Sequence, residues 1–297
     1  LELGRSLREA GWDPNPNDPA GFASTLFRTQ RRPLRVGVPF AYSMHRLLFE
    51  YLIEDIEEGT DGDILIVPTP PSLMANAVAA GDVDVFCVGE PWGTVAVNSG
   101  TAELVLPGSS TWAHAPEKVL GLRRDWAKDN DQSCGALMRA LYRSAMWLGD
   151  VKNRPLASEI LARSEHLDLS GSTIAPALTG HIIPVRGEAP WNIPHFLKFH
   201  GQATPFPWRS FGAWIGLQIS RLHGLDPVET QEKAADCMRP DLYRRHLAQS
   251  RADMPGASAK IEGALTHPTA VASTNGQMIL GPDAFFDGKT FDFSTLS

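Results

Sequence analysis

The sequence predicts an α/β fold with a helix-rich C-terminal half. Short apolar runs alternate with helical patterns up to about residue 112, and helical spacing dominates after Pro116. The length of 297 residues corresponds to about two domains at roughly 150 residues each. With 43% apolar and 21% charged residues, the composition argues against a disordered, collagen-like or coiled-coil protein.

The first part of the chain alternates strands and helices. Helical spacing over Leu3–Ala10 ends at the breakers of residues 11–16, and an alternating apolar run then predicts the first strand. Short apolar strands between helices suit a mostly parallel sheet that is buried on both faces. The expected strands are Leu34–Phe40, Asp63–Val67, Val83–Val88 and Ala102–Leu106, and the expected helices are Met44–Gly59, Leu73–Ala80 and Glu90–Asn98.

The remaining chain is mainly helical. Between Gln132 and Gly149, helical spacing puts Leu137, Leu141 and Leu148 on one stripe. Proline favours the first turn of a helix, so we expect one helix to begin at Pro227 and another at Pro240. The further helices expected are Leu156–Ser164, Ser172–Leu178, Arg209–His223, Pro227–Met238 and Pro240–Gln249.

The charge and the cysteine content argue against several classes of protein. The formal charge of −7 argues against direct nucleic-acid binding, because an acidic chain repels phosphates. Cys87, Cys134 and Cys237 are widely spaced, which predicts reduced core residues rather than a disulfide framework or a metal knuckle. No run of about 18 apolar residues predicts a membrane span.

Signatures of the common enzyme classes are absent. The sequence has no GxSxG, GxxxxGK[ST], HExxH or GxGxxG motif. His195 and His200 lie five residues apart, and helix positions face one another at spacings of three or four. We therefore expect neither a metal site nor a cofactor.

The turn after the first strand is a candidate anion site. Ser43 and His45 stand at the start of a helix, where unpaired backbone N–H groups and the helix dipole attract an anion. In the simpler interpretation, Ser43 only caps the helix and His45 lies on the surface of its first turn.

Gly89 and Lys118 are two further candidates. Gly89 ends an apolar strand and lets a ligand approach its backbone N–H. Ligands gather at the carboxyl ends of parallel strands, so this turn and the Ser43 turn should share one edge of the sheet. A cleft-facing Lys118 would add a positive charge. The alternatives are an ordinary tight turn and a solvated lysine.

These segments together resemble the nitrate/bicarbonate-binding family of solute-binding proteins. The sequences PFAYSMHRLLFEYLI (39–53), FCVGEPW (86–92) and WAHAPEKVLG (112–121) carry the resemblance. It implies a two-lobed periplasmic-binding-protein-like (type II) fold, with one lobe incomplete at the N-terminus. The expected division is a compact α/β lobe at 33–112, with 1–32 and 113–297 forming the remainder of the other lobe and a helical C-terminal extension.

The resemblance also implies the ligand contacts. They fall on the His45 side chain, the Gly89 backbone and the Lys118 side chain. Nitrate is planar, monovalent and acceptor-only, which suits donors and one cation. Bicarbonate carries an O–H that needs an acceptor, and Glu90 and Glu117 keep it open as an alternative.

The implied function is non-catalytic. Our leading hypothesis is a cytoplasmic nitrate or nitrite sensor of the NasS type, whose partner is an RNA-binding antiterminator of the NasT type. The alternative is the periplasmic substrate-binding component of an ABC transporter, which delivers nitrate or bicarbonate to a membrane permease. A third hypothesis is an enzyme on a related fold acting on a thiamine-precursor-like substrate. It lacks an assignable nucleophile and base.

Overall fold

The computed structural model describes residues 7–8, 11–29, 33–54, 64–194, 196–250 and 252–296. The chain divides into two compact units, of which unit 1 comprises Leu1–Trp112 and Arg154–Leu197 and unit 2 comprises Ala113–Asn153 and Lys198–Ser297. Unit 1 groups α2 (Pro19–Thr29) and residues 154–197 with the segment 33–112, and the lobe boundaries that the resemblance implies stay a prediction. The predicted helix at Leu3–Ala10 lies largely outside the described residues.

Unit 1 is built on a parallel sheet of three strands in the order β2-β1-β3. These strands are β1 (Leu34–Val38), β2 (Ile64–Pro68) and β3 (Val85–Phe86). Val36 pairs with Ile66 on one side and with Val85 on the other. The predicted parallel sheet is therefore confirmed, with strand ends that differ by a few residues.

An arginine–carboxylate pair fixes the two strands that carry the candidate site. Arg35 donates from Nη2 to Asp84 Oδ1 at 2.8 Å and from Nε to Asp84 Oδ2 at 3.0 Å. The Arg35 backbone N–H also donates to Asp84 Oδ2, at 2.9 Å. Such bidentate contacts add directional specificity to the charge attraction, so they hold β1 in register with the turn before β3.

Helices and 3-10 turns connect the strands of unit 1. They alternate with the strands as the hydrophobic pattern predicts. The helical elements are α3 (Met44–Ile53), η1 (Pro71–Leu73), α4 (Met74–Ala80), α5 (Trp92–Ser99), η2 (Gly108–Ser110), α8 (Arg154–Leu161) and α9 (Gly171–Thr179), and an antiparallel pair β4 (His181–Ile182) and β5 (Trp191–Asn192) follows.

Two sequence predictions in unit 1 are wrong. Ala102–Leu106 forms no strand, and the Leu104 N–H donates instead to the Pro184 carbonyl at 2.8 Å. An apolar run becomes a strand only where a neighbouring strand offers a continuous ladder of partners. The helix expected from Glu90 begins at Trp92, with Pro91 at its N-cap position.

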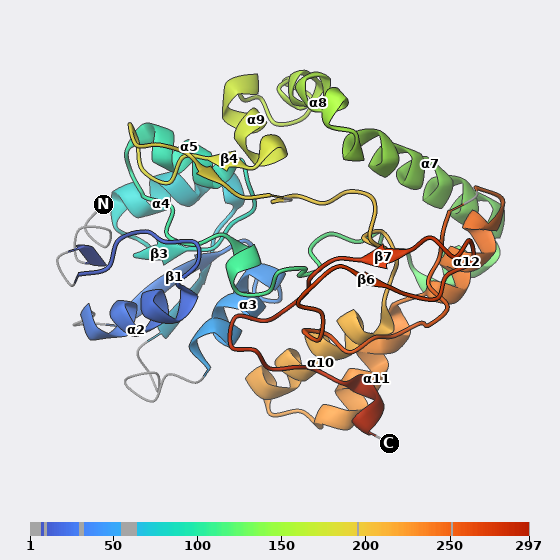
Figure 1. Cartoon of the computed structure of the whole chain (residues 1–297). Coiled ribbons are helices and arrows are strands. Elements are labelled where there is room, and N and C mark those ends of the chain that lie inside the picture. The colour runs from blue at the N-terminus through green and yellow to red at the C-terminus, as the bar shows by residue number, and fades with distance from the viewer. Residues whose placement is uncertain are drawn as a thin grey trace. The chain divides into compact units, whose positions relative to one another are not determined.

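Unit 2 is mainly helical, as predicted. Helices α10 and α11 pack side by side (Figure 1), and their backbones meet at Gly212 and Gly216. The elements are α6 (Arg124–Asp129), α7 (Asp131–Gly149), η3 (Val151–Asn153), α10 (Arg209–His223), α11 (Pro227–Cys237), α12 (Pro240–Leu247), η4 (Ala248–Ser250), an antiparallel pair β6 (Thr269–Ala270) and β7 (Ile279–Leu280), and η5 (Phe293–Leu296).

Some surface features differ from the sequence predictions. The apolar stripe of α7 is not buried, since Leu137 is 43% and Leu141 49% exposed. All three cysteines are free thiols, but Cys237 is exposed rather than in the core. Within the described ranges, every helix is too short or too polar to serve as a membrane span.

Candidate functional site

The two turns that the sequence singled out lie at one edge of the sheet. Strands β1 and β3 are parallel neighbours, so their carboxyl ends point the same way. The turn after β1 leads into α3, which starts at Met44, and the turn after β3 leads into α5. The strand-end rule therefore predicts correctly which segments meet.

Ser43 is the N-cap of α3. Its backbone is extended and its hydroxyl oxygen accepts a hydrogen bond from the Arg46 N–H at 3.3 Å. Arg46 in turn donates from Nε to Glu50 Oε1 at 3.1 Å, so its charge is paired within the helix. The structure thus gives Ser43 a structural role, and its place as a ligand contact remains a prediction.

His45 and Gly89 face one another. A Cβ atom built on Gly89 would lie 3.6 Å from His45 Nε2 and 3.9 Å from His45 Cε1. The Gly89 carbonyl accepts from the Trp92 N–H at 3.4 Å, whereas the Gly89 N–H has no acceptor among the residues that the structure describes. The imidazole therefore lies close to Gly89, and the glycine has no side chain to fill the space beside it.

The Glu90 side chain lies at the N-terminus of α5. Glu90 Oε2 accepts from the Thr94 N–H at 3.0 Å. Burial raises the pKa of the Glu90 carboxyl, and hydrogen bonds from Thr94 oppose that shift. The protein's own carboxyl group thus accepts one backbone N–H of the first turn of α5, and the predicted ligand contact at the Gly89 backbone remains a prediction. Residue spacing does not predict this hydrogen bond, because it does not determine the direction of the Glu90 side chain, which lies against the first turn of α5.

Lys118 belongs to unit 2, whereas His45 and Gly89 belong to unit 1. Its side chain is 83% exposed and forms an ion pair with Glu117. This arrangement matches the solvated lysine that the sequence left as an alternative. Its contact with a ligand remains a prediction.

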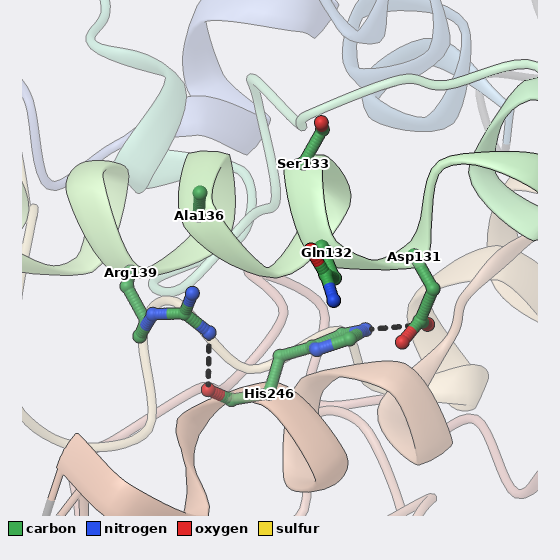
Figure 2. Close-up of a pocket in the computed structure, with 6 residues that line it drawn as sticks. All are labelled: Asp131, Gln132, Ser133, Ala136, Arg139 and His246. Atoms are coloured by element: carbon green, nitrogen blue, oxygen red, sulfur yellow. Dashed lines mark hydrogen bonds and ion pairs between the residues drawn. The ribbon is translucent and has the colours of Figure 1, made fainter.

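A pocket of about 510 Å³ lies in unit 2, between α7 and α12 (Figure 2). Its polar groups tie the two helices together. His246 Nε2 lies 3.1 Å from Asp131 Oδ1, and Arg139 Nη1 donates to the His246 carbonyl at 3.4 Å. None of the predicted ligand contacts lines this pocket, so we assign its groups to helix packing.

The described ranges hold no group of three or more side chains suited to bind a metal ion. His200 Nε2 lies 3.2 Å from the Tyr142 hydroxyl. His195 lies outside the described residues.

Comparison with known proteins identifies the family. The sequence profile of the NMT1-like family matches residues 5–162. The chain belongs to this family. Membership in this family agrees with the resemblance to nitrate/bicarbonate-binding solute-binding proteins. The relatives described below confirm that resemblance.

Relatives of this NMT1-like chain include binding and ATP-binding proteins. It is 29% identical over 265 residues to the nitrate/nitrite binding protein NrtA of Synechococcus elongatus, covering 87% of this chain and 55% of NrtA. It is 31% identical over 227 residues to the nitrate import ATP-binding protein NrtC of Synechocystis, covering 75% of this chain and 34% of NrtC. The chain thus spans about half the length of NrtA.

A solved structure confirms the predicted fold class. The periplasmic nitrate-binding protein NrtA from Synechocystis superposes with a TM-score of 0.80 over 99% of this chain and 71% of that chain, at 20% identity. At this identity the likeness establishes the fold alone. The NMT1-like chain therefore has the periplasmic-binding-protein fold that the sequence predicted.

Proposed function

We propose that the chain binds a small monovalent oxyanion, nitrate or nitrite, as the binding component of an ABC-type importer. The observation that carries this proposal is the proximity of the His45 imidazole to Gly89, where a built Cβ would lie 3.6 Å from His45 Nε2. An imidazole with its proton on Nε2 and a backbone N–H are both donors, and nitrate only accepts hydrogen bonds. The NrtA relatives, named as nitrate/nitrite binding proteins, support the same ligand.

The relatives named as nitrate/nitrite binding proteins support nitrate or nitrite over bicarbonate. Bicarbonate needs an acceptor for its O–H, and Glu90 and Glu117 were the candidates. Glu90 accepts from Thr94, and Glu117 is paired with Lys118. Each carboxylate keeps further lone pairs, so bicarbonate stays the alternative ligand. A relative named as a bicarbonate transport ATP-binding protein, CmpC of Synechococcus elongatus, makes bicarbonate the natural competitor to test.

The relatives favour a transport role over a sensor role. NrtC is named as a nitrate import protein, and the solved NrtA is named as periplasmic. We therefore propose the periplasm as the location and an ABC permease with its ATPase as the partner. The sensor role, the cytoplasmic location and an antiterminator partner of the NasT type receive no support from these relatives.

Calorimetric titration with sodium nitrate, sodium nitrite and sodium bicarbonate tests the ligand. We expect the first two to bind, and His45→Ala to weaken binding by roughly 10- to 100-fold, because a hydrogen bond to a charged group contributes about 1.5–3 kcal/mol. The Lys118→Ala variant tests the predicted contact of the Lys118 side chain with the anion. His166→Ala removes an exposed histidine of unit 1 and should bind as the unchanged chain does.

Two results would contradict the proposal in different ways. If neither nitrate nor nitrite binds, the ligand assignment is wrong. If both bind and His45→Ala leaves their affinity unchanged, the ligand assignment stands and the site assignment is wrong.

A further inference from the structure

Unit 2 holds a lysine whose charge is not paired with a carboxylate. Lys198 Nζ lies 3.3 Å from His114 Nδ1 and 3.3 Å from Gln202 Oε1, and the side chain is half-buried. In the part of the chain that the structure describes, no carboxylate lies within ion-pair distance of this ammonium. Burial lowers the pKa of Lys198, as expected for a cation that loses water without gaining a counter-ion.

Both groups that hold Lys198 are neutral. An ammonium only donates, so His114 Nδ1 is the acceptor and the ring carries its proton on Nε2. Burial, followed by the charge of Lys198, lowers the pKa of His114 to about 4, so the imidazole is uncharged at neutral pH. His114 and Gln202 thus fix two of the three ammonium protons and leave the charge uncompensated.

A second lysine in the same unit shows the usual arrangement of a structural cation. Lys260 forms ion pairs with Glu262 and Asp283, whose side chains are 0% and 2% exposed. Buried charges in proteins are normally paired in this way. Lys198 is half-buried and has no such carboxylate partner among the described residues.

The backbone conformation around Gln202 fixes the position of the Gln202 side-chain amide. Gly201, Gln202 and Ala203 have φ angles of 85°, 51° and 58°, so three successive residues are left-handed. This conformation costs energy for residues other than glycine, and such strain gathers at ligand sites. A Cβ built on Gly281 would lie 2.3 Å from Gln202 Oε1, so glycine makes room for the amide.

We propose that Lys198, Gln202 and His114 form a second site for a small monovalent oxyanion, within unit 2. The anion accepts the third ammonium proton of Lys198 and an N–H of the Gln202 amide, while His114 positions the ammonium. One uncompensated positive charge matches one negative charge, and short N⁺–H···O⁻ bonds are among the strong ones. Its three residues belong to unit 2, whereas His45 and Gly89 belong to unit 1.

Titration of the His45→Ala chain with sodium nitrate and sodium formate, at constant ionic strength, isolates this site. Calorimetry should detect one anion bound. Lys198→Met keeps the alkyl stem and removes the charge, and should weaken binding at least about tenfold. Gln202→Asn keeps a residue that tolerates the left-handed backbone but withdraws the amide by one methylene, and should weaken it severalfold. Lys233→Met removes an exposed lysine paired with Glu229 on α11 and should change nothing.

The outcomes separate this site from the proposed function. Weaker binding in Lys198→Met and Gln202→Asn, with circular dichroism and melting unchanged, supports the second site even if His45→Ala has no effect. If the His45→Ala chain binds neither anion while folded, the second site does not exist. Equal affinity with and without the Lys198→Met change overturns it as well.

Discussion

Replacing Gly89 with alanine is expected to weaken nitrate binding at least about tenfold while leaving the fold intact. The new Cβ would lie 3.6 Å from His45 Nε2, which is ordinary van der Waals contact, and Gly89 is not among the residues with positive φ. Alanine therefore fits the protein. It fills the space beside the imidazole that the proposed anion would occupy, and loss of a hydrogen bond to a charged group costs about 1.5–3 kcal/mol.

Calorimetry and thermal melting of the same Gly89→Ala sample check this prediction. Gly108→Ala is a matched control, because its Cβ would lie 3.7 Å from Leu48 Cδ1, in a similar contact within unit 1. We expect the control to bind nitrate as the unchanged chain does. Undiminished affinity in Gly89→Ala would mean that the anion does not lie between these two groups.

Replacing Gly212 with alanine is expected to destabilise unit 2 by about 2 kcal/mol or more. A Cβ there would lie 2.4 Å from the Ala234 carbonyl oxygen and 3.0 Å from Ala235 Cα, on α11. One turn along α10, a Cβ on Gly216 would lie 2.7 Å from the Thr230 carbonyl oxygen. Since backbone atoms cannot move aside as a flexible side chain does, the helices must separate, and overpacking costs about 1–3 kcal/mol or more.

This cost outweighs the gain in helix propensity. Alanine is favoured over glycine in a helix by about 1 kcal/mol. Denaturant unfolding should show a lower midpoint for Gly212→Ala. Gly121→Ala, with no heavy atom within 4 Å and no positive φ, should stay within about 0.5 kcal/mol of the unchanged chain. A midpoint for Gly212→Ala equal to that of Gly121→Ala would contradict the close packing of α10 and α11.

Hydrophobic periodicity predicted most of the helices and strands. The bounds of α10 agree with the prediction at both ends, because Gly224, with φ 61°, ends the helix. The false strand at Ala102–Leu106 shows the limit of this reasoning. Its apolar residues satisfy the strand pattern, but its partner is the carbonyl of Pro184, some eighty positions later. The local sequence does not show which distant residue provides the hydrogen-bond partner.

The candidate site was predictable where it depends on strand order. Parallel neighbours β1 and β3 bring their turns together, and the predicted meeting of His45 and Gly89 follows from that rule. The direction of the Glu90 side chain and the pairing of Lys118 with Glu117 depend on side-chain conformation, which residue spacing does not determine. The contact between His114 and Lys198 joins residues 84 positions apart and was missed for the same reason as the false strand.

The amide spectrum of the isotope-labelled chain, titrated with sodium nitrate, tests the central claim most directly. If an oxyanion binds at His45 and Gly89, the Gly89 amide resonance should shift along a saturating curve with the dissociation constant measured by calorimetry. The same titration of His45→Ala should shift it only at far higher nitrate concentration. Nitrate binding in the calorimeter with a Gly89 resonance that does not move would contradict the claim.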